Sequence, residues 1–528
     1  METLNQFFGI NKKISVVVFA LLVSFIVLCY FNFALSIGLI FIFSLTIILF
    51  IILFYLGVRD KNLYISALIV FVIHLIFASV LYFINYHTSI RIFGGGADFD
   101  LYQNNAIEFA NRLRHGIFSV EGLYTKHYFA MIIGFIYFIT VPDPIIGQMF
   151  TVFTSVFSAV LLYLLIIEIG GSKMWAFWSV IISSFYASYA IFGSFLLKEI
   201  FVIPLILLSL LILIKILKKF SLIYFIWLFI AMSAVIHFRF YIGFSLMFTF
   251  IICCFLVSKI SIRNKALISL VMGLAPALMG YGYLGWIPIN NYLALDQIRI
   301  LREVTYAPVS SQEAQKMIDE KNKKDQQKID QSKGGSSDFS EGFGQNLDTE
   351  IDFFKERNKA NSEFKTLEGR KLTAEEIAKG SGTGSSFSVK SETSNPFMFL
   401  VNYLISFSYA SFGPFPWQIK MARQIYAFVE VIPWWLFFIS ILYGGYIYIK
   451  KEGVKKFLDK YTYALPLFVF GIIAMGVISL FINNYGIIMR IRIPVILSFL
   501  AIVSLNPLLF ESVFSKLLKL LKVKRNKI

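Results

Sequence analysis

The chain has 528 residues, of which 58% are hydrophobic and 15% are charged, and its formal net charge at pH 7 is +17. A soluble protein of this length would carry far more charge and divide into several cores, so the composition excludes a soluble globular protein. Apolar runs of about 17 to 25 residues recur along the chain, long enough to cross a bilayer as helices. The sequence therefore predicts an all-α polytopic membrane protein.

Basic residues stand at the ends of these runs rather than along one face, which argues against a nucleic-acid partner. Lys12 and Lys13 precede the first run and a basic tail follows the last. The positive-inside rule therefore predicts that both termini are cytoplasmic, in a cytoplasmic (inner) membrane. About twelve spans satisfy every basic cluster, and they are 14–34, 36–57, 63–85, 147–168, 174–193, 200–218, 221–236, 241–258, 266–286, 427–450, 462–482 and 493–511.

The predicted spans divide the chain into an N-terminal three-span extension (1–85), a core region (86–286), an extracytoplasmic loop (287–395), a C-terminal membrane region (396–511) and a basic cytoplasmic tail (512–528). The extracytoplasmic loop is rich in Lys, Glu, Gln, Ser and Gly and cannot bury a core of its own, so we expect it to be largely disordered. Two shorter apolar segments, 127–141 and 397–412, are predicted to be juxtamembrane helices in the outer interface.

The first outer loop, 86–146, contains the stretch "GGGADFDLYQNNAIEFANRLRHG", in which Asp98 and Asp100 precede a run with helical spacing. One interpretation is a capped helix, because Asp98 is a good N-cap and Asp100 suits the first turn. In that case Tyr102 and Ala106 pack the helix against the bundle. The other interpretation is an acidic site outside the membrane, and the residues alone leave both open.

Other ionisable groups are predicted to reach the same outer surface from distant parts of the chain. Lys198 and Glu199 lie between two spans, Arg239 follows another, and Arg490 and Arg492 precede the last. Ionisable groups at membrane depth usually face a cavity or a partner and mark functional sites. Plainer interpretations are an interfacial ion pair, snorkelling side chains and contacts with lipid phosphates.

The pattern Asp98–x3–Tyr102–x3–Ala106, with "RHG" at the helix end, resembles the first outer loop of the GT-C superfamily of polytopic glycosyltransferases. That superfamily includes the protein mannosyltransferase and lipid A aminoarabinose transferase types. The short helix at 127–141, the span ending in "LLYLLIIEIGGSK" and the acid Glu199 continue the likeness. "FGPFPWQ" and "NYGIIMRIRIP" resemble segments of bacterial members from polysaccharide gene clusters.

The likeness covers roughly residues 86–265 and, more loosely, 396–511. Two departures from the family are the extra spans before the first outer loop and the large insertion at 290–395.

The resemblance implies a GT-C-like core that moves a sugar from a polyprenyl-phosphate donor to a lipid, glycan or protein acceptor on the outer face, in cell-envelope polysaccharide or glycoconjugate synthesis. Asp98 matches the loop acid of the family and is the expected general base. Asp100 and Glu199 could hold a divalent cation, Mg or Mn, although nothing in the sequence requires one. The leaving phosphate would be bound by positively charged side chains, namely Arg239, Arg490, Arg492 and Lys198.

Other classes of function stay open. A polysaccharide polymerase or O-antigen-ligase-like protein is also a bundle of many spans, but its catalytic groups would lie in the long loop, and 290–395 contains no histidine. A transporter or flippase should have broken helices and charges near the bilayer midplane. Here most charges lie at the ends of spans, with Glu168 and Glu430 as the main exceptions. A non-catalytic scaffold is also compatible with the sequence.

Overall fold

The computed structural model describes residues 32–88, 98–120, 123, 128–258, 260–278, 396–419, 422–482 and 484–505. All regular elements in these ranges are helices, and eight helical segments among them are long and apolar enough to cross a membrane. A helix satisfies its backbone hydrogen bonds internally, as lipid requires. The protein is therefore a multi-pass membrane protein.

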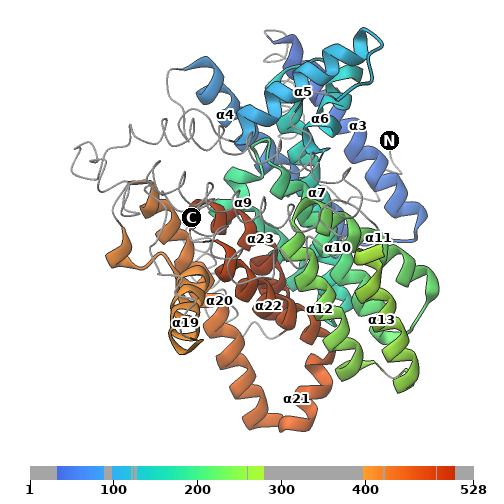
Figure 1. Cartoon of the computed structure of the whole chain (residues 1–528), viewed down its shortest axis with the longest axis vertical. Helices are drawn as coiled ribbons and strands as arrows, with labels where there is room; N and C mark the ends of the chain where they lie inside the picture. Colours follow the sequence, from blue (N-terminus) through green and yellow to red (C-terminus); the bar gives the residue numbers. More distant parts are fainter. Residues whose placement is uncertain are drawn as a thin grey trace, which may run out of the picture. The chain divides into compact units, whose positions relative to one another are not determined.

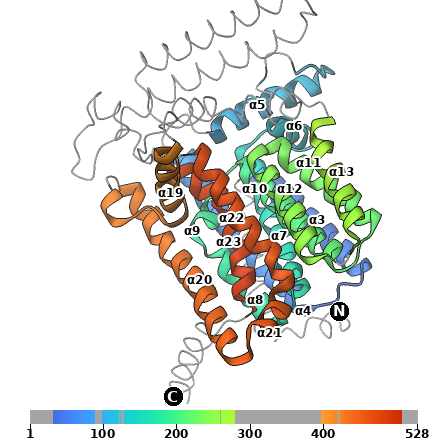
Figure 2. The same ribbon diagram turned by 60° about the horizontal axis from the view of Figure 1, so that its bottom comes forward.

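The helices of the described residues are shown in Figures 1 and 2, and they are α3 (Phe33–Tyr55), α4 (Lys61–His87), α5 (Asp98–Arg114), α6 (Phe129–Ile139), α7 (Pro144–Glu168), α8 (Lys173–Ser184), α9 (Ala187–Phe192), α10 (Lys198–Lys218), α11 (Leu222–Phe238), α12 (Phe240–Val257), α13 (Ile262–Leu278), α19 (Pro396–Phe412), η4 (Pro416–Gln418), α20 (Ala422–Glu452), α21 (Val454–Tyr461), η5 (Thr462–Ala464), α22 (Leu465–Phe481) and α23 (Tyr485–Val503).

Most predicted spans in the described ranges are confirmed as helices, and the short segments at 127–141 and 397–412 form α6 and α19. The number of about twelve spans stays a prediction, because 14–34 lies almost wholly outside the described residues. The segments 287–395 and 512–528 also lie outside them.

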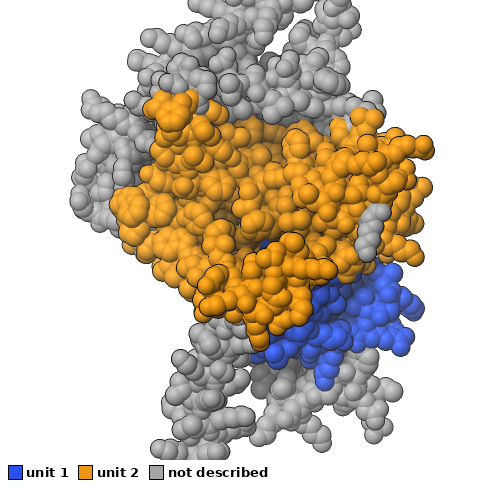
Figure 3. Space-filling model, turned by 90° about the horizontal axis from the view of Figure 1, so that it is seen from below, with its two compact units in different colours: residues 1–92, 98–211, 500–507 blue, residues 93–97, 212–499, 508–528 orange. Residues whose placement is uncertain are grey.

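The structure divides into two compact units, which Figure 3 shows in different colours. Unit 1 comprises residues 1–92, 98–211 and 500–507, and unit 2 comprises residues 93–97, 212–499 and 508–528. In unit 1, α4 packs against α7 and α8, and α3 packs against α7. In unit 2, α12 packs against α11 and α22, and α19 packs against α22.

Helices α4 and α7 of unit 1 are antiparallel, as contacts at both of their ends show. The hydroxyl of Tyr82, near the end of α4, lies 3.5 Å from Asp143, the N-cap of α7. At the other end, Asp60, the N-cap of α4, forms an ion pair of 3.1 Å with Lys173, which follows α7. Unit 1 therefore has one end with Arg59, Lys61 and Lys173 and an opposite end at the start of α7.

The predicted span 174–193 is not one continuous helix. It ends at Ser184, and a six-residue helix, α9, follows after a break at Phe185 and Tyr186. The hydroxyls of Ser183 and Ser184 donate to the carbonyls of Val180 and Ile181, at 2.7 Å each, and such bonds disturb a helix. Expecting a single regular helix here was wrong.

The last span also differs from its predicted range of 493–511, because α23 begins eight residues earlier, at Tyr485. The side chain of Asn484 accepts from the backbone N–H of Gly486 at 2.9 Å, so Asn484 caps the helix start. Arg490 and Arg492 therefore lie inside a transmembrane helix rather than in a loop before it. The residues on either side of the two arginines are apolar, as a span requires.

Candidate functional site

The first turn of α5 is docked in unit 1 by aromatic contacts. The ring of Phe99 stacks on that of Phe195, with centroids 5.3 Å apart. Tyr102 meets Phe129 of α6 edge to face at 5.2 Å, and both Tyr102 and Ala106 are buried. Asp98 is the first residue of α5 and Asp100 is half-buried, and the two stand on either side of Phe99 in the sequence.

Hydrogen bonds hold α5 along its length on α6. The hydroxyl of Tyr137 donates to the side-chain oxygen of Gln103, and Arg114 donates to the backbone carbonyl of Tyr137 at 2.9 Å. Burial raises the pKa of the Tyr137 phenol well above its usual range, so the phenol stays protonated and remains a donor. These contacts hold α5 against α6.

The close approach of α5 and α6 requires a glycine. A Cβ at Gly134 would lie 2.8 Å from the carbonyl oxygen of Ala106 and 2.8 Å from the ring of Phe109. We expect Gly134→Ala to lower the free energy of unfolding by about 1–3 kcal/mol, because α6 must move away from α5. The control is Gly273→Ala in α13, where no described atom lies within 4 Å of the new Cβ.

That control should leave stability unchanged or raise it by about 0.5–1 kcal/mol, as alanine favours a helix over glycine. Melting temperatures of the two purified variants measure the difference. Equal melting temperatures would contradict the tight α5–α6 contact.

Lys198 and Glu199 form the start of α10 and are buried, each with 5% of its surface exposed. The sequence predicts that both lie between two spans, and the structure has them in the first turn of a helix. Leu196, two residues before Lys198, packs against Gly147 near the start of α7. A Cβ added at Gly147 would lie 3.0 Å from the Leu196 side chain. Glu199 also lies in the first turn of α10, where a negative charge is favourable. A buried ionisable pair among transmembrane helices is a candidate site.

Unit 1 thus brings the start of α5 and the start of α10 to the same end. Phe195 is three residues before Lys198, and Phe99 lies between the two aspartates of α5, so their stacking joins the two segments. The sequence predicts that these acidic and basic residues face one surface, but no pattern in it marks Phe99 and Phe195 as partners. Among the described residues, no three His, Cys, Asp or Glu side chains cluster closely enough to hold a metal ion.

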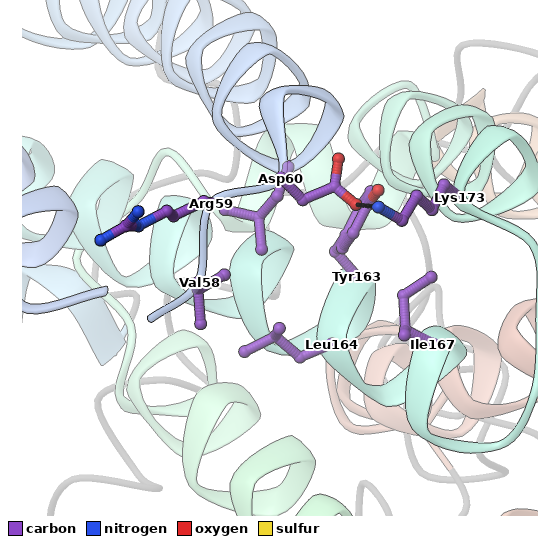
Figure 4. Close-up of a pocket in the computed structure, with 8 residues that line it drawn as sticks. Val58, Arg59, Asp60, Tyr163, Leu164, Ile167 and Lys173 are labelled. Carbon is purple, nitrogen blue, oxygen red and sulfur yellow. Dashed lines mark ion pairs between the residues drawn. The ribbon is translucent and has the colours of Figure 1, made fainter. Parts of the chain in front are cut away.

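At the opposite end of unit 1 lies a notch of about 340 Å³, lined by Val58, Arg59, Asp60, Leu63, Tyr163, Leu164, Ile167 and Lys173. Figure 4 shows Asp60 and Lys173 pointing toward each other near Tyr163, whereas Arg59 points away. One oxygen of Asp60 accepts from the backbone of Asn62 at 3.1 Å and the other pairs with Lys173 at 3.1 Å. Because both oxygens already have a partner, this carboxylate stabilises the fold and is not a candidate base.

Arg239 of unit 2 lies in the non-helical joint between α11 and α12 and is half-buried. Its guanidinium donates to the hydroxyl of Tyr241 at 3.1 Å. The Tyr241 ring stacks on Phe481 at 6.2 Å, at the end of α22. Arg239 is therefore held next to the segment that leads into α23, which carries the other two predicted arginines.

Arg492 is fully buried in unit 2, with 0% of its side chain exposed. Its guanidinium pairs with the carboxylate of Glu430 in α20 at 3.3 Å and donates to the carbonyl of Gly413, which follows α19, at 3.3 Å. The predicted role of Arg492 in binding a phosphate stays a prediction, but this side chain already joins three segments. In the sequence Glu430 stands out as a charge within a span, but no local pattern connects it with Arg492.

Arg490 is half-buried and precedes Arg492 by two positions on the same helix. With 3.6 residues per turn, the two side chains leave the helix about 200° apart. Because Arg492 faces Glu430, Arg490 faces another direction. The two arginines therefore cannot bind one phosphate side by side. A loop, where the sequence places them, would have allowed that arrangement.

The fold and these ionisable groups define a multi-pass helical membrane protein with buried charges placed in each of its two units. No protein-family model, curated protein or solved structure matches the chain.

Proposed function

We propose that the protein is a GT-C-type glycosyltransferase, which transfers a sugar from a polyprenyl-phosphate donor to a lipid, glycan or protein acceptor on the outer face of the membrane. The observation that carries the proposal is the stacking of Phe99 on Phe195 at 5.3 Å. It brings the acidic start of α5 against Phe195, three residues before the buried Lys198 and Glu199. Glycosyl transfer needs a carboxylate and positive charge at one site, and these two segments supply both.

In the proposed reaction the acceptor hydroxyl oxygen attacks the anomeric carbon of the sugar. The bond from that carbon to the phosphate oxygen breaks, and polyprenyl phosphate leaves with the electron pair. Asp98 takes the hydroxyl proton as general base. A positive charge beside the leaving phosphate stabilises it, and Lys198 is the candidate within unit 1. If a divalent cation takes part, Asp100 and Glu199 are the candidate ligands, and their oxygens suit Mg or Mn.

The arginines predicted to bind the donor phosphate are Arg239, Arg490 and Arg492. Arg490 is tested first, because substitution of Arg492 would also break its ion pair with Glu430 and disturb the fold. We expect Arg490→Lys to impair transfer by at least about 10-fold with normal expression, because a point charge cannot reproduce a bidentate fork. Transfer rate and donor binding measure the effect. Wild-type values for both would remove Arg490 from the site and leave Arg239 as the better candidate.

The proposed topology has about twelve spans with cytoplasmic termini and the start of α5 outside. The separation of Arg59, Lys61 and Lys173 from the α5 end of unit 1 supports it, since basic residues favour the cytoplasmic side. We expect Asn104→Cys in α5 to react with an impermeant thiol reagent in intact cells. Lys61→Cys at the start of α4 should react only after permeabilisation.

Both substituted positions are exposed, and the native Cys253 and Cys254 are buried, so they should contribute little background. Cells that carry the native chain give the remaining background. The reverse labelling pattern would place α5 in the cytoplasm and contradict both the orientation and the proposed reaction.

The direct test of function uses the purified chain in lipid nanodiscs. A panel of polyprenyl-monophosphate sugars is supplied together with an extract of envelope acceptors, and release of polyprenyl phosphate is measured. Release that depends on the acceptor supports the proposal. Use of diphosphate-linked oligosaccharides in place of monophosphate donors would instead favour the polymerase or ligase class.

A further inference from the structure

A short amphipathic helix, α21, forms the turn between α20 and α22 at one end of unit 2 (Figure 1). Its apolar residues are spaced three or four apart, so they share one stripe of the helix, and they are Val454, Phe457, Leu458 and Tyr461. Phe457 and Tyr461 contact each other at 4.6 Å and reach back to Tyr448 of α20. Val454 and Leu458 are 58% and 60% exposed. Phe457 and Tyr461 of the stripe thus pack on the protein, whereas Val454 and Leu458 are exposed.

Lysines lie just before α21 and within it, and together with those at the end of α10 we call them the basic cluster. The end of α10 joins it, because the ammonium of Lys218 lies 5.0 Å from the ring of Tyr463, just after α21. Only two acidic residues, Glu452 and Asp459, lie in this part of the sequence, and Glu452 pairs with Lys456 at 3.0 Å. The basic cluster consists of Lys215, Lys218, Lys219, Lys450, Lys451, Lys455, Lys456 and Lys460.

The transmembrane helix that precedes α21 also carries exposed apolar side chains near its end. Leu442 and Tyr446 of α20 are exposed on the turns that lead toward α21. A helix with an apolar stripe and lysines, next to the end of a span, has the composition of a helix that lies in the membrane surface. Lysines at that depth attract the negative charge of anionic lipids.

We propose that the basic cluster binds the headgroups of anionic phospholipids, with Val454 and Leu458 inserted among the acyl chains. An acidic protein would satisfy the lysines but would leave the apolar half of the stripe beside the bilayer without a partner. A lipid satisfies both, since it presents negative charge and hydrocarbon side by side. This inference rests on unit 2 alone and does not depend on the proposed glycosyl transfer.

The test compares three forms of the full chain, purified in detergent and titrated with short-chain phosphatidylglycerol or phosphatidylcholine. They are the native chain, the K455Q/K456Q/K460Q variant and a control, K61Q/R263Q, which removes two exposed basic charges elsewhere. Native mass spectrometry counts bound lipids, and the melting temperature reports their stabilising effect. We expect the native chain and the control to retain phosphatidylglycerol over phosphatidylcholine, and the cluster variant to lose at least about 10-fold in apparent affinity.

Two further measurements separate the proposal from a loss of folding. The K455R/K456R/K460R variant keeps the charge and should bind phosphatidylglycerol as the native chain does. Leu458→Asn keeps the lysines and should weaken binding of the lipid, while soluble glycerol phosphate should not compete. Native-like lipid binding by the glutamine variant, equal loss in the control, or full competition by glycerol phosphate would each overturn the proposal.

Discussion

Replacement of Asp98 by asparagine is expected to reduce sugar transfer by roughly 100-fold or more, because the amide cannot accept the proton of the acceptor hydroxyl. Asparagine has the same shape and caps a helix about as well as aspartate, so α5 should keep its position and its contact with Phe195. The measurement is release of polyprenyl phosphate by the purified variant, with its melting temperature recorded beside it. An unchanged melting temperature with lost transfer identifies Asp98 as a catalytic residue.

Two control variants in α5 separate this role from a general charge effect. Glu108→Gln removes the same charge from an exposed position that pairs with Arg112 at 3.0 Å, and it should leave transfer unchanged. Asp100→Asn tests the neighbouring carboxylate. A loss of transfer confined to this variant would indicate that Asp100 binds a cation or stabilises the start of α5. If Asp98→Asn is fully active, Asp98 is only a helix cap, and Glu199 becomes the next candidate for the base.

Replacement of Glu430 by glutamine is expected to lower the free energy of unfolding by about 3–5 kcal/mol, because Arg492 is left as an uncompensated buried charge. The pair is 3.3 Å apart and both side chains are fully buried. This should be the largest stability effect of any single substitution in the pair's surroundings. Unfolding in mixed detergent micelles, followed by melting temperature and by denaturant titration, measures it.

The double variant Glu430→Leu with Arg492→Met gives the matched control. It removes both charges and keeps the volume apolar, so it should be much more stable than Glu430→Gln. The coupling energy of the two residues follows when Glu430→Leu and Arg492→Met are also measured as single variants, which closes the double-mutant cycle. If the double variant is as unstable as the single variant, the ion pair is not the source of the loss. If the double variant is stable and still transfers sugar, Arg492 acts by positioning α23, and the donor phosphate is bound elsewhere.

The sequence alone was enough to identify most of the helices. A bilayer requires about 20 consecutive apolar residues in a span, and each backbone group must be satisfied within the helix. That requirement acts on local sequence, so α3, α4, α7 and α10 could be recognised without knowledge of their neighbours. The same holds for α6 and α19, which are too short or too polar at their edges to be ordinary spans. Composition likewise excluded a soluble protein.

Only the tertiary structure decided where the ionisable groups lie. The break after Ser184 is tolerated because the segment that follows is buried by other helices of unit 1, and the apolar pattern carries no trace of that burial. Arg492 can lie within a span because Glu430 reaches it from 62 residues away in the chain. The start of α5 meets the start of α10 through two phenylalanine rings about a hundred residues apart, and no local pattern marks them as partners. Whether a charge can be buried depends on the groups that face it in the folded protein. The positions of the ionisable groups therefore could not be predicted before the packing of the helices was known.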